Sequence, residues 1–367
     1  MLIVFSVLIG FALLIACLIL LYSPGKIRPF LDDAGNPLAR SISEKVFVDI
    51  GGVKQGMFIK GKNLENPVLL FVHGGPCFSE YFLVEKHPTG LEEIFTVCYW
   101  EQRGGGISYS PEVPTESITL EQLARDAIEV TEYLRKRFDK EKIYMMAHSG
   151  GTAFAIQAAA KAPELYHAYI GMSQISRQIE SERLAYGFLL SKYRESGNAR
   201  MQRKLEKFTV FESESQTVSF FKSPVRDQAM HRLGVGTMRD MKSIFRGVFL
   251  PIMLCRAYTF REKISIWISK LSFIRKTDLI YQLLHTDLTS KIQRLDIPVY
   301  FFSGAYDLTV NLTLSKAYLD TLEAPLKGFY TFEKSAHSPL FEEPERIRQI
   351  LREDILSGQA DFPTLRE

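Results

Sequence analysis

The sequence predicts an α/β protein built on a doubly wound, mostly parallel sheet, with an inserted helical cap and a single transmembrane helix in front. Three observations predict this architecture. Buried apolar runs alternate with helical patterns, which is typical of a parallel sheet with crossover helices. The alternation stops between residues 176 and 290 and then resumes. The first 22 residues carry no charged side chain.

The composition is that of a globular protein, because 46% of the 367 residues are hydrophobic and 24% are charged. The net charge of +3 gives no support to nucleic-acid binding. The four cysteines contain no C-x-x-C pair, so neither a metal site nor a disulfide scaffold is indicated. We therefore expect no metal and no cofactor.

Residues 1–22 form an apolar run of the length that spans a bilayer, about 20 residues. A cleaved signal peptide would have a positive n-region and a shorter apolar stretch. We therefore expect an uncleaved, single-pass membrane anchor, with the membrane as a partner. Lys26, Arg28 and Arg40 follow the run, which is a weak indication of a cytoplasmic catalytic domain, and the side of the membrane is left open. Residues 23–44 are interpreted as a juxtamembrane linker.

Residues 45–175 are predicted to form the first part of the sheet domain. Gly51-Gly52 separates two short apolar segments, as in a strand pair. The later runs are continuously apolar, as expected for strands buried on both faces. Thr119 and Gln122 fit a capping box at the start of a long helix. In order, the expected elements are strands at 45–50, 56–60, 68–72 and 94–100, a helix from 120 to beyond 134, a strand at 143–146, a helix at 152–162 and a strand at 166–172.

Residues 176–290 lack clear strands, are helical in composition and carry an excess of Arg and Lys. A basic helical segment is often only a solvated surface. This one interrupts a sheet, and insertions at the carboxyl ends of strands lie over the crevice where ligands bind. We therefore interpret it as a cap. The sheet domain resumes in residues 291–367, with a strand that starts at Ile297, a helix at 312–322, a strand at 328–332 and a last helix at 344–356.

Three residues of catalytic type each follow a predicted buried strand. Ser149 stands between a strand and an Ala-rich helix, with the small residues Ala147 and Gly151 two positions away, as on the sharp turn of a nucleophilic serine. Asp307 and His337 follow the two strands of the last segment. These strand ends should lie at one edge of the sheet, so we expect the three side chains to lie together. Their order, serine then acid then histidine, is that of a hydrolase triad.

In this interpretation Ser149 is the nucleophile, His337 is its general base, and Asp307 orients the imidazole. A tetrahedral oxyanion needs backbone N–H donors. We expect them from Gly150, directly after the nucleophile, and from Gly75, in a glycine-rich loop that follows a strand. A plain turn at Ser149 or Asp307 and a surface loop at His337 are the simpler alternatives. The order of three residue types at three strand ends favours the triad.

Three further residues near these motifs are expected to be structural. His73 would hydrogen-bond its own loop, and His148 would point away from the substrate. Cys77 would fill space in its loop, because a complete serine-based set lies elsewhere in the sequence.

Several motifs stand at the predicted strand ends. They are His73-Gly74-Gly75-Pro76, Glu101-Gln102-Arg103-Gly104-Gly105-Gly106-Ile107-Ser108, the Ser149 turn, Gly304 with Asp307, and Ala336-His337-Ser338-Pro339 with Glu343-Pro344. Together they resemble the prolyl iminopeptidase branch of the α/β-hydrolases over residues 45–175 and 291–367. The family usually has Gly where Cys77 stands, Asp where Glu101 stands and Gly where Ala147 stands. The resemblance implies a serine hydrolase that acts through an acyl-enzyme on a small amide or peptide.

In aminopeptidases of this kind, acidic groups, some of them from the cap, hold the free amine of the substrate. The sequence selects none of the cap glutamates for this role. The candidates are Glu180, Glu182, Glu195, Glu206, Glu212, Glu214 and Glu262.

Three functions stay open, with a small-molecule amide, peptide or ester as the partner. The first is a hydrolase that cleaves a small amide or a peptide from its N-terminus. The second is a membrane-associated carboxylesterase or lipase, which the anchor and the aromatic stretch at 244–258 motivate. The third is a catalytically silent binding module on a hydrolase scaffold, against which the intact triad argues. Ser149 excludes the carboxylate nucleophile that dehalogenases and epoxide hydrolases need.

Overall fold

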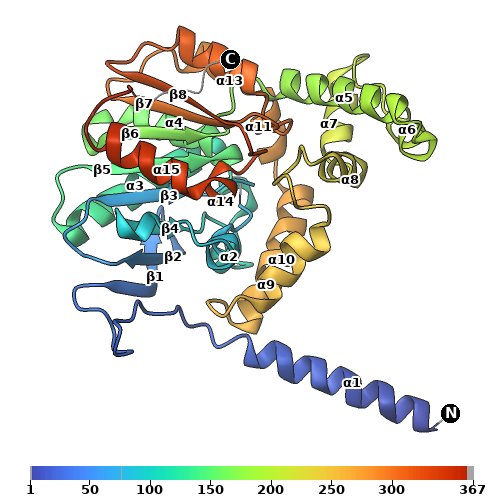
Figure 1. The fold of residues 1–367 in the computed structure, drawn as a ribbon, viewed down its shortest axis with the longest axis horizontal. Helices are drawn as coiled ribbons and strands as arrows, with labels where there is room; N and C mark the ends of the chain where they lie inside the picture. The colour runs from blue at the N-terminus through green and yellow to red at the C-terminus, as the bar shows by residue number, and fades with distance from the viewer. Residues whose placement is uncertain (1, 76, 362–367) are drawn as a thin grey trace.

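The computed structural model describes residues 2–75 and 77–361, so Met1, Pro76 of the predicted loop motif and residues 362–367 lie outside the described part. Within it, eight strands form one sheet in the order β1-β2-β4-β3-β5-β6-β7-β8 (Figure 1). β1 pairs with β2 and β2 with β4 in antiparallel fashion, and the other neighbours are parallel, which confirms the predicted mostly parallel sheet. The strands are β1 (Ile42–Ile50), β2 (Val53–Gly61), β3 (Val68–Val72), β4 (Thr96–Trp100), β5 (Ile143–His148), β6 (Tyr166–Met172), β7 (Val299–Gly304) and β8 (Lys327–Phe332).

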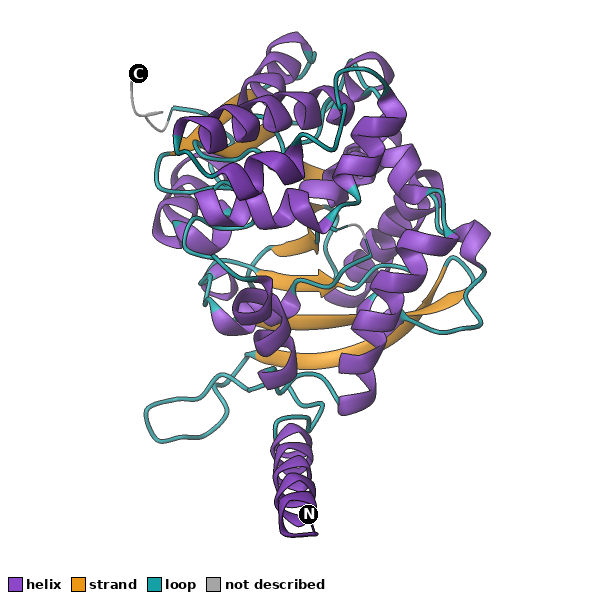
Figure 2. Ribbon diagram, turned by 90° about the vertical axis from the view of Figure 1, so that its right-hand side faces the viewer, coloured by secondary structure: helices purple, strands orange, loops and turns teal. Residues whose placement is uncertain are grey.

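Helices cover both faces of the sheet (Figure 2). In β3, Val68, Leu70 and Val72 belong to one core cluster, whereas Leu69 and Phe71 belong to another. Burial of alternate side chains on two faces explains why the strand is apolar throughout. The first cluster includes side chains of α3 (Leu120–Phe138), α4 (Thr152–Lys161) and α13 (Leu312–Thr321), and the second includes side chains of α2 (Tyr81–Lys86), α14 (Pro339–Glu342) and α15 (Pro344–Ile350).

The segment between β6 and β7 is helical, as the sequence predicts for the cap. Its first half has a core of its own, which includes Leu189 and Phe220, and a buried ion pair between Arg226 and Glu182. Its second half packs on the sheet domain through residues such as Tyr258. The helices are α5 (Gln178–Glu195), α6 (Ala199–Leu205), α7 (Glu214–Phe221), α8 (Pro224–Leu233), α9 (Leu250–Leu254), α10 (Phe260–Lys276), α11 (Leu279–His285) and α12 (Leu288–Lys291).

The N-terminal helix α1 (Leu2–Leu21) projects from the rest of the protein (Figures 1 and 2). Within the part of the chain that the structure describes, no helix combines the length and the apolar character needed to cross a membrane. The predicted transmembrane anchor at residues 1–22 is therefore wrong, and so is the single-pass membrane localisation. The expected membrane partner, which depended on that anchor, is left without support. Crossing the hydrocarbon core takes an unbroken apolar helix of about 20 residues.

Candidate active site

Ser149 lies on the tight turn between β5 and α4. Its φ is +50°, in the left-handed region that costs a non-glycine residue about 1–2 kcal/mol. The neighbouring backbone leaves no room for a larger residue after the turn. A Cβ at Gly151 would lie 2.4 Å from the carbonyl oxygen of His73 and 2.8 Å from that of Val72. This close packing explains the small residue two positions after Ser149.

We expect Gly151→Ala to lower the free energy of unfolding by about 1–3 kcal/mol, the usual cost of overpacking. The added methyl group would press on backbone at the end of β3, which cannot yield without disturbing the sheet. Gly187→Ala in α5 is the matched control, because a Cβ there would meet only Phe211 at 3.5 Å. Alanine should be neutral or stabilising at that helical position. Urea unfolding measures both variants, and an unchanged midpoint for Gly151→Ala would contradict the prediction.

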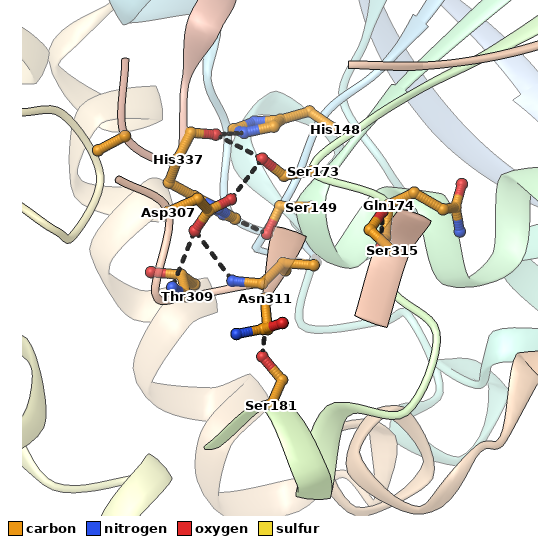
Figure 3. A network of polar contacts seen from close by, with 12 residues as sticks. His148, Ser149, Ser173, Gln174, Ser181, Asp307, Thr309, Asn311, Ser315 and His337 are labelled. Carbon is orange, nitrogen blue, oxygen red and sulfur yellow. Dashed lines mark hydrogen bonds and ion pairs between the residues drawn. The ribbon is translucent and has the colours of Figure 1, made fainter. Parts of the chain in front are cut away.

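The structure brings together the three residues that the sequence predicts as a triad (Figure 3). Ser149 Oγ lies 2.7 Å from His337 Nε2, and His337 Nδ1 lies 2.9 Å from Asp307 Oδ2. Asp307 follows β7 and His337 follows β8, at the sheet edge where β5 ends. Because the Nδ1–H of His337 donates to the carboxylate, Nε2 is free to accept from the Ser149 hydroxyl. This is the tautomer that a general base requires.

The carboxylate of Asp307 is almost fully buried and is held by several donors. Its Oδ2 atom accepts from the Ser173 hydroxyl at 2.7 Å as well as from His337. Its Oδ1 atom accepts from the backbone N–H groups of Thr309 at 2.8 Å and Val310 at 2.9 Å. These bonds fix the carboxylate, and through it the imidazole of His337.

Ser173 is a site residue that the sequence reasoning did not identify. It follows β6 directly, and β6 lies between β5 and β7 in the sheet. The rule that singled out Ser149 and Asp307 at strand ends could therefore have found it. Its φ of +50° gives it the same unusual backbone conformation as Ser149. A lone serine after a strand carries no motif, so only the position was available as a signal.

A buried ion pair lies behind Ser149. His148 Nδ1 is 2.8 and 2.9 Å from the two carboxylate oxygens of Glu80, and Nε2 is 2.8 Å from the carbonyl oxygen of His337. Both ring nitrogens donate to these acceptors, so the imidazole is cationic. Burial opposes the charge of each group, but their mutual attraction outweighs it, raising the pKa of His148 and lowering that of Glu80. Glu80, which the sequence reasoning did not single out, thus fixes the residue that supports the backbone of His337.

The two predicted oxyanion donors, Gly75 and Gly150, both line the cavity at Ser149. Gly150 stands at the start of a helix, where backbone N–H groups lack partners within the helix. Gly75 has a φ of +105°, and a Cβ on it would lie 2.8 Å from Phe78 Cβ. Only glycine fits this position without strain. The loop therefore brings unhindered backbone to the edge of the cavity.

His73 and Cys77 support the loop that carries Gly75. The Nδ1–H of His73 donates to the carbonyl oxygen of Gly74 at 2.8 Å, and its Nε2 accepts from the N–H of Gln102 at 3.3 Å. Burial lowers the pKa of His73 and raises the pKa of the Cys77 thiol, so both are held uncharged. Cys77 has a φ of +57°, which explains why glycine is usual here in the family that the sequence resembles.

Ser149 opens into a cavity of about 230 Å³ between the sheet domain and the cap. Its apolar wall includes Phe82, Phe221 and Leu283. Its charged lining residues include the ion pair of Glu80 with His148, together with Arg226, Asp227 and Lys270. Among the described residues, the cap glutamates considered from the sequence all lie outside this lining, and no group of His, Cys, Asp and Glu is arranged to hold a metal ion.

Comparisons with known proteins agree with this fold. The family model of the alpha/beta hydrolase fold matches residues 67–344. The probable aminopeptidase YbaC of Bacillus subtilis (strain 168) is 33% identical over 317 residues, covering 86% of this chain and 97% of that protein. The proline iminopeptidase of Saccharolobus solfataricus is 25% identical over 311 residues, covering 81% and 86% of the two chains.

Among solved structures, the proline iminopeptidase of Mycobacterium smegmatis has a TM-score of 0.62 at 15% identity, covering 86% of this chain and 100% of that one. At this identity the likeness shows a shared fold. The family model, which matches most of the chain, and the 33% identity to the Bacillus relative show membership of a family as well as a fold. The chain therefore belongs to the α/β-hydrolase fold family, and it is a hydrolytic enzyme.

Proposed function

We propose that the protein is a serine hydrolase that removes the N-terminal residue from a short peptide or a small amide. The observation that carries the proposal is the hydrogen-bonded chain from Ser149 through His337 to Asp307, which opens on a small cavity. The similarity to proteins named as an aminopeptidase and a proline iminopeptidase supports the choice of a peptide substrate.

In this mechanism His337 Nε2 accepts the proton of Ser149 as Oγ attacks the substrate carbonyl. The N–H groups of Gly75 and Gly150 stabilise the oxyanion, and each such donor is worth about 2.7–4 kcal/mol. His337 then donates its proton to the leaving amine, which leaves an acyl group on Ser149. Water, deprotonated by the same imidazole, releases the acyl group. Asp307 orients the imidazole and stabilises its cation throughout.

Asp227 is the candidate to bind the free amine of the substrate. Among the described residues, the carboxylates that line the cavity are those of Glu80 and Asp227, and both oxygens of Glu80 are bound to His148. Asp227 Oδ1 lies 3.1 Å from Arg226 Nη1. That guanidinium already pairs with Glu182, through Nε at 2.7 Å and Nη2 at 2.5 Å. One cation is therefore shared by two carboxylates, and the excess negative charge suits an ammonium group.

We expect Asp227→Asn to raise KM for substrates with a free α-amine by about 10–100-fold, the worth of a hydrogen bond to a charged group. The value of kcat should stay nearly unchanged, since the amide keeps the shape of the carboxylate and loses only its charge. Steady-state kinetics on an aminoacyl arylamide measures the effect, and the same arylamide without its amine should be insensitive. Glu212→Gln, an exposed cap carboxylate outside the cavity lining, is the control. A fall in kcat at constant KM would argue against amine binding by Asp227.

The apolar wall also suits an acyl ester, so a carboxylesterase is the second candidate. The deciding experiment compares turnover of prolyl and alanyl arylamides with that of a short-chain acyl ester by the full-length protein. Ser149→Ala is the blank. Arylamide cleavage that depends on Ser149 supports the aminopeptidase, and cleavage of the ester alone would replace it with an esterase. Turnover of neither by a folded protein would favour a binding module.

A further inference from the structure

Lys270 places a positive charge in the cavity that holds Ser149. It stands on α10 in the cap and lines the cavity together with Asp227. Its Nζ atom lies 4.6 Å from the centre of the Phe78 ring and 6.0 Å from that of Trp267. These two rings are the close partners of the ammonium. Among residues 2–75 and 77–361, the ammonium has no partner for a hydrogen bond or an ion pair.

The other charges around the cavity leave Lys270 without a counter-ion. The ion pair behind the nucleophile is neutral overall. Arg226 is shared by Glu182 and Asp227, so one negative charge remains there. Asp227 acts on Lys270 through its charge, but the two are too far apart to form an ion pair. Lys270 and Asp227 therefore present separate charges of opposite sign to the cavity, which is the pattern that a zwitterionic ligand would match.

The surroundings of Lys270 favour an anion as its missing partner. Burial lowers the pKa of its ammonium, and the charge of Asp227 offsets part of that effect. The ring of Phe78 also offsets part of the cost of burying the Lys270 ammonium, because an aromatic face attracts a cation. A lysine offers a single point charge, whereas bidentate recognition of a phosphate or sulfate group is the property of arginine. The small cavity and the ammonium of Lys270 thus suit one carboxylate.

Phe78 contacts both Lys270 and the loop of Gly75, so it places the ammonium relative to Ser149. Its Cβ atom packs against Gly75, the proposed oxyanion donor, so closely that a Cβ there would lie 2.8 Å away. The ammonium above the Phe78 ring is therefore on the side of the cavity next to the oxyanion loop. A carboxylate bound there would belong to a part of the substrate close to the scissile carbonyl. The C-terminal carboxylate of a dipeptide and the acidic side chain of the residue after the scissile bond are the two sources.

A basic cleft adjoins the cavity. It has a volume of about 910 Å³, and Met241 lines both the cleft and the cavity at Ser149. Basic side chains outnumber acidic ones in its lining, with Lys86, Arg239, Lys242, Arg246 and Lys334 against Asp240 and Glu342. A surface of one sign raises the local concentration of ligands of the opposite sign. The basic cleft beside the cavity should therefore attract negatively charged ligands, as Lys270 does inside the cavity.

We propose that Lys270 binds a carboxylate of the substrate and so selects short peptides that carry a free carboxylate close to the scissile bond. That the substrate is a peptide rests on the proposed function. The selection for a negatively charged substrate does not, because Lys270 would bind the carboxylate of an ester as well as that of an amide. It deepens the role of the cavity at Ser149: Asp227 would hold the amine and Lys270 the carboxylate of one small zwitterion.

The test compares three substrates of the full-length protein: a dipeptide of the best N-terminal residue with glycine, its C-terminal amide, and the amide of the same dipeptide with aspartate in place of glycine. We expect the wild type to favour the free dipeptide over its amide by about tenfold or more in kcat/KM, as a charge-assisted hydrogen bond allows. Lys270→Met should abolish this preference, Lys270→Glu should reverse it, and Lys270→Arg should retain most of it. The aspartyl peptide distinguishes the C-terminal carboxylate from an acidic side chain.

Lys276→Met is the matched control, because Lys276 is exposed on the same helix and lies outside the lining of the Ser149 cavity. Turnover of an aminoacyl arylamide, which has a free amine and no carboxylate, reports on the peptidase function separately, and its absence would overturn that function alone. The charge selection would then be measured with O-butyrylglycolate, whose carboxylate lies on the leaving-group side of the ester as it does in the dipeptide, against ethyl butyrate. A preference for the carboxylate that survives both Lys270→Met and Lys270→Glu, or a wild type without any preference, would overturn the inference.

Discussion

Replacing Ser149 with alanine is expected to lower kcat about a millionfold on the best substrate, as for other serine nucleophiles of a triad. The hydroxyl lies 2.7 Å from His337 Nε2, and without it no acyl-enzyme can form. KM should change little, because the cavity wall and its charged residues remain in place. Single-turnover kinetics with an arylamide or an ester measures the loss, and the free energy of unfolding serves as the check on folding.

The Ser149→Ala and His337→Ala double variant should be hardly slower than either single variant, because residues that act as one unit are not additive. Ser191→Ala, at an exposed position of α5, is the control and should keep the wild-type rate. If the loss of kcat in the double variant equalled the product of the two single losses, the serine and the histidine would act in separate steps. A Ser149→Ala protein that keeps most of its rate would exclude the serine mechanism.

The sequence could place Ser149, Asp307 and His337 because each follows a strand that is visible as an apolar run. In a parallel sheet such positions meet at one edge, so a local pattern predicts a contact between residues far apart in the chain. Gly75 and Gly150 followed from the same logic, since they flank the expected oxyanion. The helical character of the cap could also be predicted, because residues 176–290 lack the strand pattern.

The rest of the site depends on packing that no local pattern encodes. Glu80 meets His148 across 68 residues of sequence, and nothing distinguishes it from the other acidic residues before folding. Asp227 and Lys270 reach the cavity only because α8 and α10 fold over the sheet, whereas the cap glutamates considered from the sequence lie outside its lining. At the other end of the chain, composition alone suggested a membrane span at residues 1–22, which the described residues do not provide.

Glu80→Gln is expected to lower the free energy of unfolding by about 3 kcal/mol, the lower end of the cost of breaking a buried ion pair. Glutamine removes the negative charge that raises the pKa of His148. A neutral imidazole has a single N–H, so it cannot donate both to residue 80 and to the carbonyl of His337. One buried acceptor then loses its donor, and the backbone of His337 loses its support. Urea unfolding monitored by circular dichroism measures the loss.

The pH dependence of this loss has a defined sign. The pKa of His148 is raised above its ordinary 6.5, so its contribution is complete below that value and is lost as the pH rises through the folded pKa. The pKa of Glu80 is lowered below its ordinary 4.5, so its contribution is complete above that value and is lost as the pH falls through the folded pKa. The difference between wild type and Glu80→Gln should therefore be largest between pH 4.5 and 6.5 and should shrink on either side.

Unfolding at about pH 5.5 and about pH 8.5 tests this window, since the second value lies well above the ordinary pKa of histidine. Glu121→Gln is the matched control, because Glu121 is 67% exposed and pairs with Arg125 one helical turn away. An exposed pair of that kind contributes about 0.5 kcal/mol or less. If the difference for Glu80→Gln were the same at both pH values, Glu80 would be a neutral acid that donates to an uncharged His148. The support of His337 would then depend on hydrogen bonding alone, and the cation behind Ser149 would be absent.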